Sequence, residues 1–525
     1  MRIQRISKVY YSLTHWHDFR LKLFGEGILI GLFAGIIIVL FRYLIEQAEG
    51  LRTAIYNYLQ AGHLSMTVLL FLGLLGIAYV LNWIVTFEPM SAGSGIPQVK
   101  GIILSLMKMN WLRVLINKFI GGVVAIGAGL SLGREGPSIQ LGATIGQGLS
   151  RLLGRTKMEE RYLITSGASA GLAAAFNAPL AGVIFSLEEL HKNFSPVVLM
   201  SAVAAALTAD VVSQHFFGVN PIFYFSGLPI LPIRYYGFII LLGIAIGVLG
   251  IVFNRVLIKT LNIYEKQRLL TGMGKIALPL MVAGIIGFIL PEILGGGNNL
   301  VDELALKPFS LTMLCILFIS KFLFTMLSYG SGVPGGIFLP MLVIGALAGS
   351  IFSHIAIQVG ALDSYYSTTI IVLSMAAYFS AVVKAPITGS ILIMEMTGSF
   401  DHMLSLIVVS MSSYLVADIF KIKPIYEELL ERSLSKQGKV PVNMTSKNRV
   451  VIELVICIDS KLNGKQIKSI DWPLHCLLVS IKRGDVELVP KGDTRILAGD
   501  YLFVLTNVDQ VKQIRNLAEE CISGV

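Results

Sequence analysis

Three clusters bounded by glycine and proline lie between long apolar stretches of the sequence. They are Gly-Ser-Gly-Ile-Pro at 93–97, Gly-Arg-Glu-Gly-Pro at 133–137 and Gly-Gly-Ile-Phe-Leu-Pro at 335–340. Proline is tolerated in the first turn of a helix because its missing N–H would have no partner there. Each cluster therefore predicts a helix start whose free backbone N–H groups attract an anion. Partial charges hold an ion without trapping it, which suits transport.

Two side chains that carry hydroxyl groups accompany predicted helix starts. Ser94 lies inside the first cluster, and Tyr426 follows Lys-Pro-Ile at 423–425. Each hydroxyl can donate a hydrogen bond to a bound anion. Two alternatives stay open on local sequence alone: an ordinary helix cap for Ser94 and an interfacial aromatic for Tyr426.

Glu135 lies between arginine and glycine inside an apolar region, where an ionisable side chain is costly and indicates function. Its ionised carboxylate is an anion that can occupy the pocket made by helix N-termini, and the protonated side chain can leave that pocket. Proton binding and anion binding would then be linked. A salt bridge with Arg134 is the weaker interpretation, because adjacent residues on a helix point in different directions.

Three more charged residues lie in or at the end of apolar segments. Glu188 and Glu189 end an apolar helix, and a solvated helix terminus is at least an equal interpretation for Glu188. Lys118 is a second intramembrane charge that either tunes the electrostatics or extends its ammonium to the membrane surface.

The composition places these residues in a membrane. Hydrophobic residues make up 54% of the 525 residues, charged residues only 14%, and the mean hydropathy is +0.74. Segments 66–87 and 364–383 contain no charged residue and can cross a hydrocarbon core of about 30 Å. Soluble classes are therefore excluded. The net charge of +10 is attributed to cytoplasmic Lys/Arg bias and not to nucleic-acid binding.

The charges of the N-terminal segment indicate on which side of the membrane it lies. Within residues 1–22, five Lys or Arg face one Asp, which indicates a cytoplasmic N-terminus, and the segment lacks the features of a removable signal peptide. We expect it to remain as a surface helix. The four cysteines show neither metal-type spacing nor a disulfide framework, which suits a reducing cytoplasm.

Other functional classes find little support. Paired carboxylates, metal-spaced His/Cys groups and a nucleophile elbow are absent from the sequence, so we expect no enzymatic activity, no cofactor and no metal. A potassium-uptake subunit would need a filter such as Thr-Val-Gly-Tyr-Gly, which the sequence also lacks.

An internal repeat divides the apolar part. Asn-Ala-Pro-Leu-Ala-Gly at 177–182 precedes Glu188, and Lys-Ala-Pro-Ile-Thr-Gly at 384–389 precedes Glu395 with the same spacing, an offset of 207 (395 − 188). A glycine-rich helix start lies upstream of each copy. Two homologous halves are predicted, and transporters commonly place a substrate site between such halves near the midplane.

The sequence changes character near residue 440. Before it, from 1 to 440, lies the apolar membrane domain; residues 441–525 show short alternating runs with frequent charges. Strands are predicted at 450–458, 477–483, 486–489 and 501–506, and a helix at 508–521. This indicates a small α+β domain.

The membrane motifs, in their order and at their distances, resemble the CLC family of chloride channels and chloride/proton antiporters over about residues 25–435. The resemblance implies an all-α polytopic membrane protein with a CLC-type inverted repeat of two homologous halves. It also implies a homodimer in the cell membrane with one pathway per subunit. The expected contact lies on segments 181–190, 197–212, 387–397 and 404–419.

The same resemblance assigns roles by position. Chloride would contact the hydroxyls of Ser94 and Tyr426 and the backbone N–H groups of Ile337 and Phe338. Glu135 would be the external gating and proton residue, Glu189 would transfer protons on the internal side, and Lys118 would tune the electrostatics. The carboxylate at position 189 resembles the residue found there in the antiporters of the family, so we expect chloride to be exchanged for protons. A passive chloride channel is the alternative. Serine at position 94 is similar to the chloride-selective branch.

The tail lacks the tandem CBS pair of many eukaryotic members. Its Trp-Pro at 472–473, Pro-Lys-Gly-Asp at 490–493 and Ala-Gly-Asp at 498–500 are similar to the TrkA-C (RCK C-terminal) regulatory domain. Such domains pair as dimers and bind small ligands, in some bacteria cyclic di-AMP. The resemblance therefore implies a bacterial protein with a cytosolic C-terminus and a cyclic dinucleotide near Ile467, Trp472, Pro473 and His475. A basic loop that is only a solvated turn is the alternative.

Overall fold

The computed structural model describes residues 16–436 and 449–514, except 193, 224, 226, 268, 269, 271, 458, 459, 474, 475, 485, 508, 509 and 512. The chain forms two compact units, Met1–Leu430 and Glu431–Val525. The boundary predicted near residue 440 and most of the predicted N-terminal surface segment lie outside the described residues. Each unit is described by itself.

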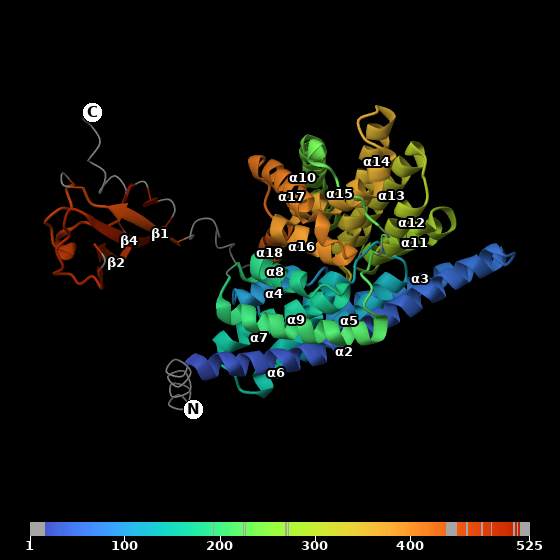
Figure 1. The fold of residues 1–525 in the computed structure, drawn as a ribbon. Helices are drawn as coiled ribbons and strands as arrows, with labels where there is room; N and C mark the ends of the chain where they lie inside the picture. Colours follow the sequence, from blue (N-terminus) through green and yellow to red (C-terminus); the bar gives the residue numbers. More distant parts are fainter. Residues whose placement is uncertain are drawn as a thin grey trace. The chain divides into compact units, whose positions relative to one another are not determined.

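The membrane unit consists of helices in two consecutive sets (Figure 1). The first set comprises α2 (Trp16–Gln60), α3 (Thr67–Phe87), α4 (Ile96–Ile103), α5 (Trp111–Gly127), α6 (Glu135–Leu152), α7 (Lys157–Phe176), α8 (Pro179–Phe185) and α9 (Pro196–Phe217). The second comprises α10 (Tyr236–Lys266), α11 (Gly272–Ile289), α12 (Asn298–Leu306), α13 (Leu311–Gly330), α14 (Phe338–Gln358), α15 (Ser367–Val383), α16 (Pro386–Thr397) and α17 (Met403–Ile419), and α18 (Ile425–Lys436) follows.

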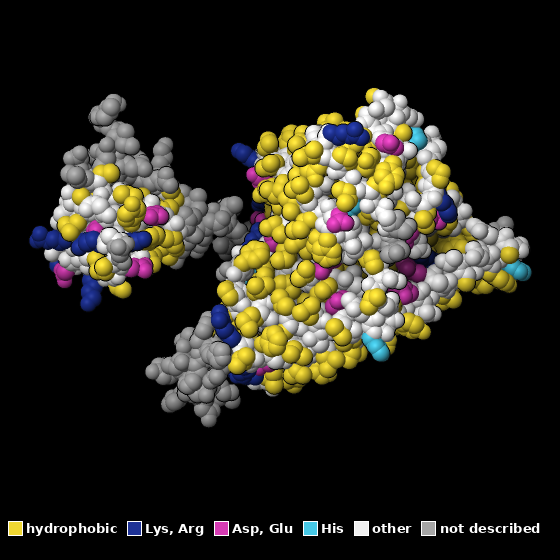
Figure 2. Space-filling view, viewed as in Figure 1, with side chains coloured by type: hydrophobic (Ala, Val, Ile, Leu, Met, Phe, Trp, Pro, Cys, Tyr) yellow, Lys and Arg dark blue, Asp and Glu magenta, His cyan; other side chains and the backbone are white. Residues whose placement is uncertain are grey.

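Among the described residues, nine helical segments are long and apolar enough to cross a membrane. They differ in how deeply they are enclosed. In its most apolar stretch, the segment containing α15 is 83% buried inside the protein, whereas α3 is 22% buried. Figure 2 shows hydrophobic side chains spread over the surface of this unit, as expected for a surface that faces lipid. The prediction of a polytopic all-α membrane domain is confirmed.

Small residues let the central helices approach closely. A Cβ added at Gly142 of α6 would overlap the carbonyl oxygen of Gly167 in α7, and one added at Gly349 of α14 would overlap Ser374 of α15. Close backbone approach of this kind is the usual way in which membrane helices associate. It fixes α6 against α7 and α14 against α15, and so holds the starts of α6 and α14 in place.

The two sets of helices form a repeat. Two equivalent contacts between them, in which a carboxylate of each set caps a helix of the other, show this relationship. The carboxylate of Glu188 accepts a hydrogen bond of 2.7 Å from the N–H of Thr388 at the start of α16. The carboxylate of Glu395, at the end of α16, accepts one of 2.7 Å from the N–H of Ala181 at the start of α8. The same offset of 207 relates both carboxylates (395 − 188) and both donors (388 − 181). The predicted repeat is confirmed, and Glu188 is a cap in place of a solvated terminus.

The second unit contains a four-stranded antiparallel sheet. Its strands are β1 (Arg449–Val455), β2 (Leu477–Arg483), β3 (Val486–Leu488) and β4 (Asp500–Asn507), in the order β1-β4-β2-β3. Alternate residues such as Ile452, Leu502 and Val504 form its core. The four predicted strands are present, although β1 ends earlier than expected; most of the predicted helix at 508–521 lies outside the described residues.

Candidate functional site

Two of the glycine clusters meet although they lie 203 residues apart (336 − 133). The N–H of Gly133 donates to the carbonyl of Gly336 at 2.7 Å, and the N–H of Gly336 donates back to Gly133 at 2.8 Å. The starts of α6 and α14 follow within two residues of this pair. Because the first N–H groups of a helix have no partner along the chain, two positive helix ends converge here.

Glu135 is the first residue of α6 and is fully buried. A Cβ added at Gly133 would overlap its Oε2 and lie 3.0 Å from the backbone nitrogen of Leu339. The carboxylate is therefore turned back toward the paired glycines and the start of α14. Neither oxygen has a hydrogen-bond partner in the described part of the chain. The side chain thus lies where an anion attracted by the two helix ends would bind.

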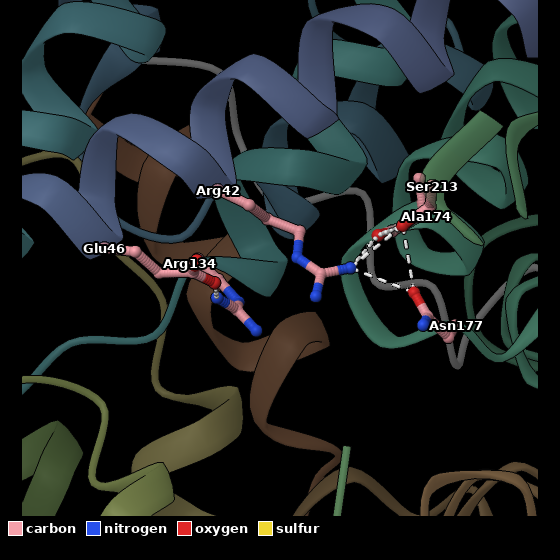
Figure 3. A network of polar contacts seen from close by, with 6 residues as sticks. All are labelled: Arg42, Glu46, Arg134, Ala174, Asn177 and Ser213. Atoms are coloured by element: carbon pink, nitrogen blue, oxygen red, sulfur yellow. Dashed lines mark hydrogen bonds and ion pairs between the residues drawn. The ribbon is translucent and has the colours of Figure 1, made fainter. Parts of the chain in front are cut away.

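Arg134 takes no part in a pair with Glu135. Its Nη1 lies 3.3 Å from Oε1 of Glu46 on α2, and Figure 3 shows these two side chains together. In the same view Arg42 reaches the carbonyl of Ala174 and the side chains of Asn177 and Ser213. The cations near Glu135 therefore have partners of their own, and the Glu135 carboxylate is left without one among the described residues.

The remaining cluster, Gly-Ser-Gly-Ile-Pro at 93–97, lies against the first turn of α6. Ser94, just before α4, is 1% exposed, and a Cβ added at Gly136 would overlap its Oγ. Glycine is required at position 136 for this approach. Lys118 of α5 is fully buried and donates to the carbonyls of Ser91 at 3.0 Å and Gly93 at 2.5 Å. Its ammonium does not extend to the surface; it holds the chain that leads into Ser94.

A row of aromatic rings connects the start of α14 to Tyr426. Phe185 of α8 packs against Phe338 with ring centroids 6.1 Å apart and against Tyr426 at 6.5 Å. Ile337, Phe338 and Tyr426 are fully buried. The predicted first-turn prolines lie where expected in α4, α6 and α14, whereas Pro424 directly precedes α18. Tyr426 is the second residue of that helix.

Several buried polar atoms of this region have no partner among the described residues, and they include the Oγ of Ser94, the hydroxyl of Tyr426 and the carboxylate of Glu135. Leaving a buried polar group unpaired costs about 1–3 kcal/mol, so each such group calls for an explanation. These groups lie near the starts of α4, α6, α14 and α18. Two hydroxyl donors and a carboxylate whose place an anion could take are the groups expected at an anion-binding site.

Sequence reasoning missed the partner of Glu189. This residue lies in a π-helical turn, Ser186–His191, and its Oε1 is 2.7 Å from the ammonium of Lys100 on α4. Lys100 also lies 3.7 Å from Oε1 of Glu427, which in turn pairs with Lys192. A π-turn is frequent at functional sites and here directs Glu188 and Glu189 to different partners. A lysine three residues after Pro97 in an apolar helix was the available signal.

The membrane unit matches a family model described as "Voltage gated chloride channel" over residues 76–418. The protein belongs to this family, called CLC. A second model, the TrkA-C domain, matches residues 451–519 of the tail. The CLC helices and the TrkA-C sheet thus correspond to the two units of the fold.

Similar proteins are known from sequence and structure. The chain is 36% identical over 361 residues to the H(+)/Cl(-) exchange transporter ClcA of Salmonella paratyphi B, covering 67% of this chain and 76% of that one. A crystal structure of a slow cyanobacterial Cl-/H+ antiporter aligns with a TM-score of 0.76 at 31% identity, over 79% of this chain and 99% of that one. A eukaryotic CLC transporter aligns at 0.67 and 22% identity, over 79% and 74% of the two chains, which supports the fold.

The predicted ligand region of the TrkA-C domain is only partly described. Ile467 and Trp472 pack against the core of the domain, and the indole N–H of Trp472 donates to the Ile467 carbonyl at 3.2 Å. Pro473 is half-buried beside them, and His475 lies outside the described residues. Ile467 and Trp472 therefore have a structural role in this domain.

One ion pair joins the two central strands of the sheet, at the end of β2 and the start of β4. Arg483 donates to both carboxylate oxygens of Asp500 at 2.8 Å, and the N–H of Leu497 donates to Oδ2. Burial alone would raise the pKa of Asp500, but the hydrogen bonds from Arg483 and Leu497 together hold that pKa below its usual range.

Proposed function

We propose that this CLC protein is a secondary transporter that exchanges chloride for protons. One observation carries the proposal: the Glu135 carboxylate lies, without a partner in the described chain, beside the Gly133–Gly336 pair where α6 and α14 begin. The names of the similar proteins, an H(+)/Cl(-) exchange transporter and a Cl-/H+ antiporter, support it.

In the proposed cycle, chloride is held by the hydroxyls of Ser94 and Tyr426 and by the N–H groups of Ile337 and Phe338. The ionised Glu135 carboxylate competes for the same positive helix ends. Protonation removes its charge, so the side chain leaves and chloride takes its place. The passage of chloride is thereby linked to the binding and release of protons by Glu135.

On the opposite side, Glu189 is proposed to pass the proton to the cytoplasm. Its carboxylate is buried, and the charged side chains of Lys100, Glu427 and Lys192 lead from it to the surface, which supports a path for the proton. Lys118 is proposed to tune chloride binding through the carbonyls it holds before Ser94. With the cytoplasmic N-terminus proposed from charge, the Glu189 end and the TrkA-C domain would face the cytoplasm of a bacterial cell.

Reconstituted vesicles test the exchange. A chloride gradient should drive protons uphill, recorded with a pH electrode, in the wild type. In Glu135→Ala, chloride flux should persist while proton movement stops. Asp401→Ala, which removes an exposed carboxylate just before α17, is the control and should leave both fluxes unchanged. Chloride flux without proton movement in the wild type would indicate the passive channel instead, and proton coupling that survives Glu135→Ala would refute the gating role.

The protein is also proposed to be a homodimer. On α17 the exposed apolar residues Leu404, Ile407, Met411 and Leu415 follow one helical face, which a second copy or lipid can cover. In the tail, Val451, Val455 and Leu477 are about half exposed and lie on the outer face of the sheet. Such an apolar face in water favours pairing. Val451→Lys/Leu477→Lys should weaken self-association of the isolated tail in sedimentation, whereas a tail that is monomeric already in the wild type would contradict this pairing.

Binding of a cyclic dinucleotide to the TrkA-C domain remains part of the proposal. Calorimetric titration of the whole protein with cyclic di-AMP tests it, and the absence of heat would remove it.

A further inference from the structure

A basic pocket lies between the second half of α10 and the segment that leads into α18. Its volume is about 440 Å³, and its lining consists of Asn254, Arg255, Ile258, Lys259, Asn262, Lys421, Ile422, Lys423 and Glu428. Four Lys or Arg and one Glu give it a formal charge of +3 (4 − 1). The lining shares no residue with the anion and proton site.

The cations line the pocket from two elements. Arg255, Lys259 and Asn262 follow one another at helical spacings of four and three and so share one face of α10. Lys421 approaches from the other wall on a left-handed backbone, with a φ of 52°. The side chains of Arg255, Lys259 and Lys421 have no hydrogen bond or ion pair within the described part of the chain. An excess of positive over negative charge in one pocket attracts an anion.

Asn254 adds a second and independent indication of a ligand. It is 1% exposed, and its Nδ2 donates to the Val382 carbonyl at 3.0 Å. Its Oδ1, in contrast, is buried without a partner among the described residues. An amide oxygen can only accept, so the missing partner must be a donor such as a hydroxyl. Phosphate oxygens alone, which the cations would hold, cannot satisfy it.

We propose that this pocket binds a phosphate ester that also carries hydroxyl groups. Arg255, Lys259 and Lys421 hold the phosphate, as guanidinium and ammonium groups do elsewhere, and Asn254 accepts from a hydroxyl. The volume lies within the range of roughly 300–1,000 Å³ that is typical of ligand pockets. The headgroup of an anionic lipid and a soluble nucleotide share this chemistry. Because Lys421 and Lys423 lie just before α18, occupancy would steady the helix that carries Tyr426.

Binding to the whole detergent-purified protein tests the proposal without any transport measurement. Native mass spectrometry would record retained phosphatidylglycerol, phosphatidylethanol and phosphatidylcholine; calorimetric titration would record ADP. The test variant is Arg255→Gln/Lys259→Gln/Lys421→Gln. The control, Lys108→Gln/Arg113→Gln/Lys157→Gln, also removes three positive charges, but from exposed positions outside the pocket.

The test variant should bind its ligand about tenfold more weakly or worse, because each lost cation removes a charge-assisted contact, and the control should bind like the wild type. Preference for phosphatidylglycerol over phosphatidylcholine identifies a lipid source, and binding of ADP identifies a soluble one. Equal binding by the test variant and the control, or no binding of either ligand by the wild type, would overturn the site. Phosphatidylethanol, a phosphodiester with the charge of phosphatidylglycerol but no hydroxyl group, would overturn the role of Asn254 if it bound as tightly as phosphatidylglycerol.

Discussion

Lys100 and Glu189 form an ion pair of 2.7 Å in which the two side chains are only 1% and 3% exposed. The pair joins α4, which begins just after Ser94, to the π-helical turn that follows α8. The helix start proposed to bind chloride and the residue proposed to carry protons are therefore held to each other directly. Glu427 lies at the same ammonium and directly follows Tyr426, so the contact extends to α18.

Removing one member of this pair should destabilise the protein strongly. Lys100→Met leaves the buried Glu189 carboxylate without its cation, and breaking a buried ion pair in this way costs about 3–5 kcal/mol. Lys100→Met/Glu189→Met should recover most of that loss, because two apolar side chains replace two charges while Glu427 keeps Lys192. Thermal unfolding in detergent measures both. A double variant less stable than Lys100→Met would contradict a direct pair.

Gly133→Ala should displace the Glu135 side chain, the proposed gate, without removing its carboxylate. The added Cβ would overlap Oε2 of Glu135 and crowd the backbone of Leu339, so the side chain has to leave its place between the helix starts. We expect chloride flux to persist and the number of protons moved per chloride to fall severalfold. Paired chloride and proton recordings on vesicles measure this ratio.

The matched control is Gly76→Ala on α3, where an added Cβ meets nothing within 4 Å. It should keep the wild-type ratio. Normal coupling in Gly133→Ala would mean that the observed position of the Glu135 side chain has no part in exchange.

The reciprocal caps predict two similar losses of stability. Glu188→Ala removes the acceptor for the N–H groups at the start of α16, and Glu395→Ala does the same for α8. Loss of a helix cap costs about 0.5–2 kcal/mol. We expect the midpoint of thermal unfolding to fall in both variants and to stay unchanged in Glu303→Ala, which lies at a more exposed ion pair. A fall in only one of the two would argue against equivalent roles in the repeat.

The sequence predicted the elements of the site better than their partners. Glycine and proline act locally, so the clusters at 133–137 and 335–340 located the starts of α6 and α14 correctly. The contacts of Glu188 with Thr388 and of Glu189 with Lys100 join residues that are 200 and 89 positions apart. Such pairs depend on how the two halves pack, which local patterns do not contain. For the same reason a solvated end was an equal interpretation for Glu188 and Lys100 was overlooked.

The TrkA-C domain should lose stability in acid through Asp500. Its pKa is lowered in the folded state, so the carboxylate stabilises the domain at pH values above the ordinary aspartate pKa of about 3.9, and this contribution disappears as the pH falls through the folded value. Arg483 is 38% exposed on its side chain, so solvent screening limits the effect of Arg483→Gln at pH 7 to about 1 kcal/mol. Urea unfolding of residues 441–525 at pH 7 and in stepwise more acidic buffers measures both quantities.

The difference in unfolding free energy between Arg483→Gln and the wild type should shrink toward acid pH, because protonated Asp500 no longer attracts the guanidinium. Lys465→Gln, which removes an exposed cation elsewhere in the domain, should leave the pH dependence unchanged. A gap between Arg483→Gln and the wild type that is constant with pH would show that this ion pair does not set the pKa of Asp500.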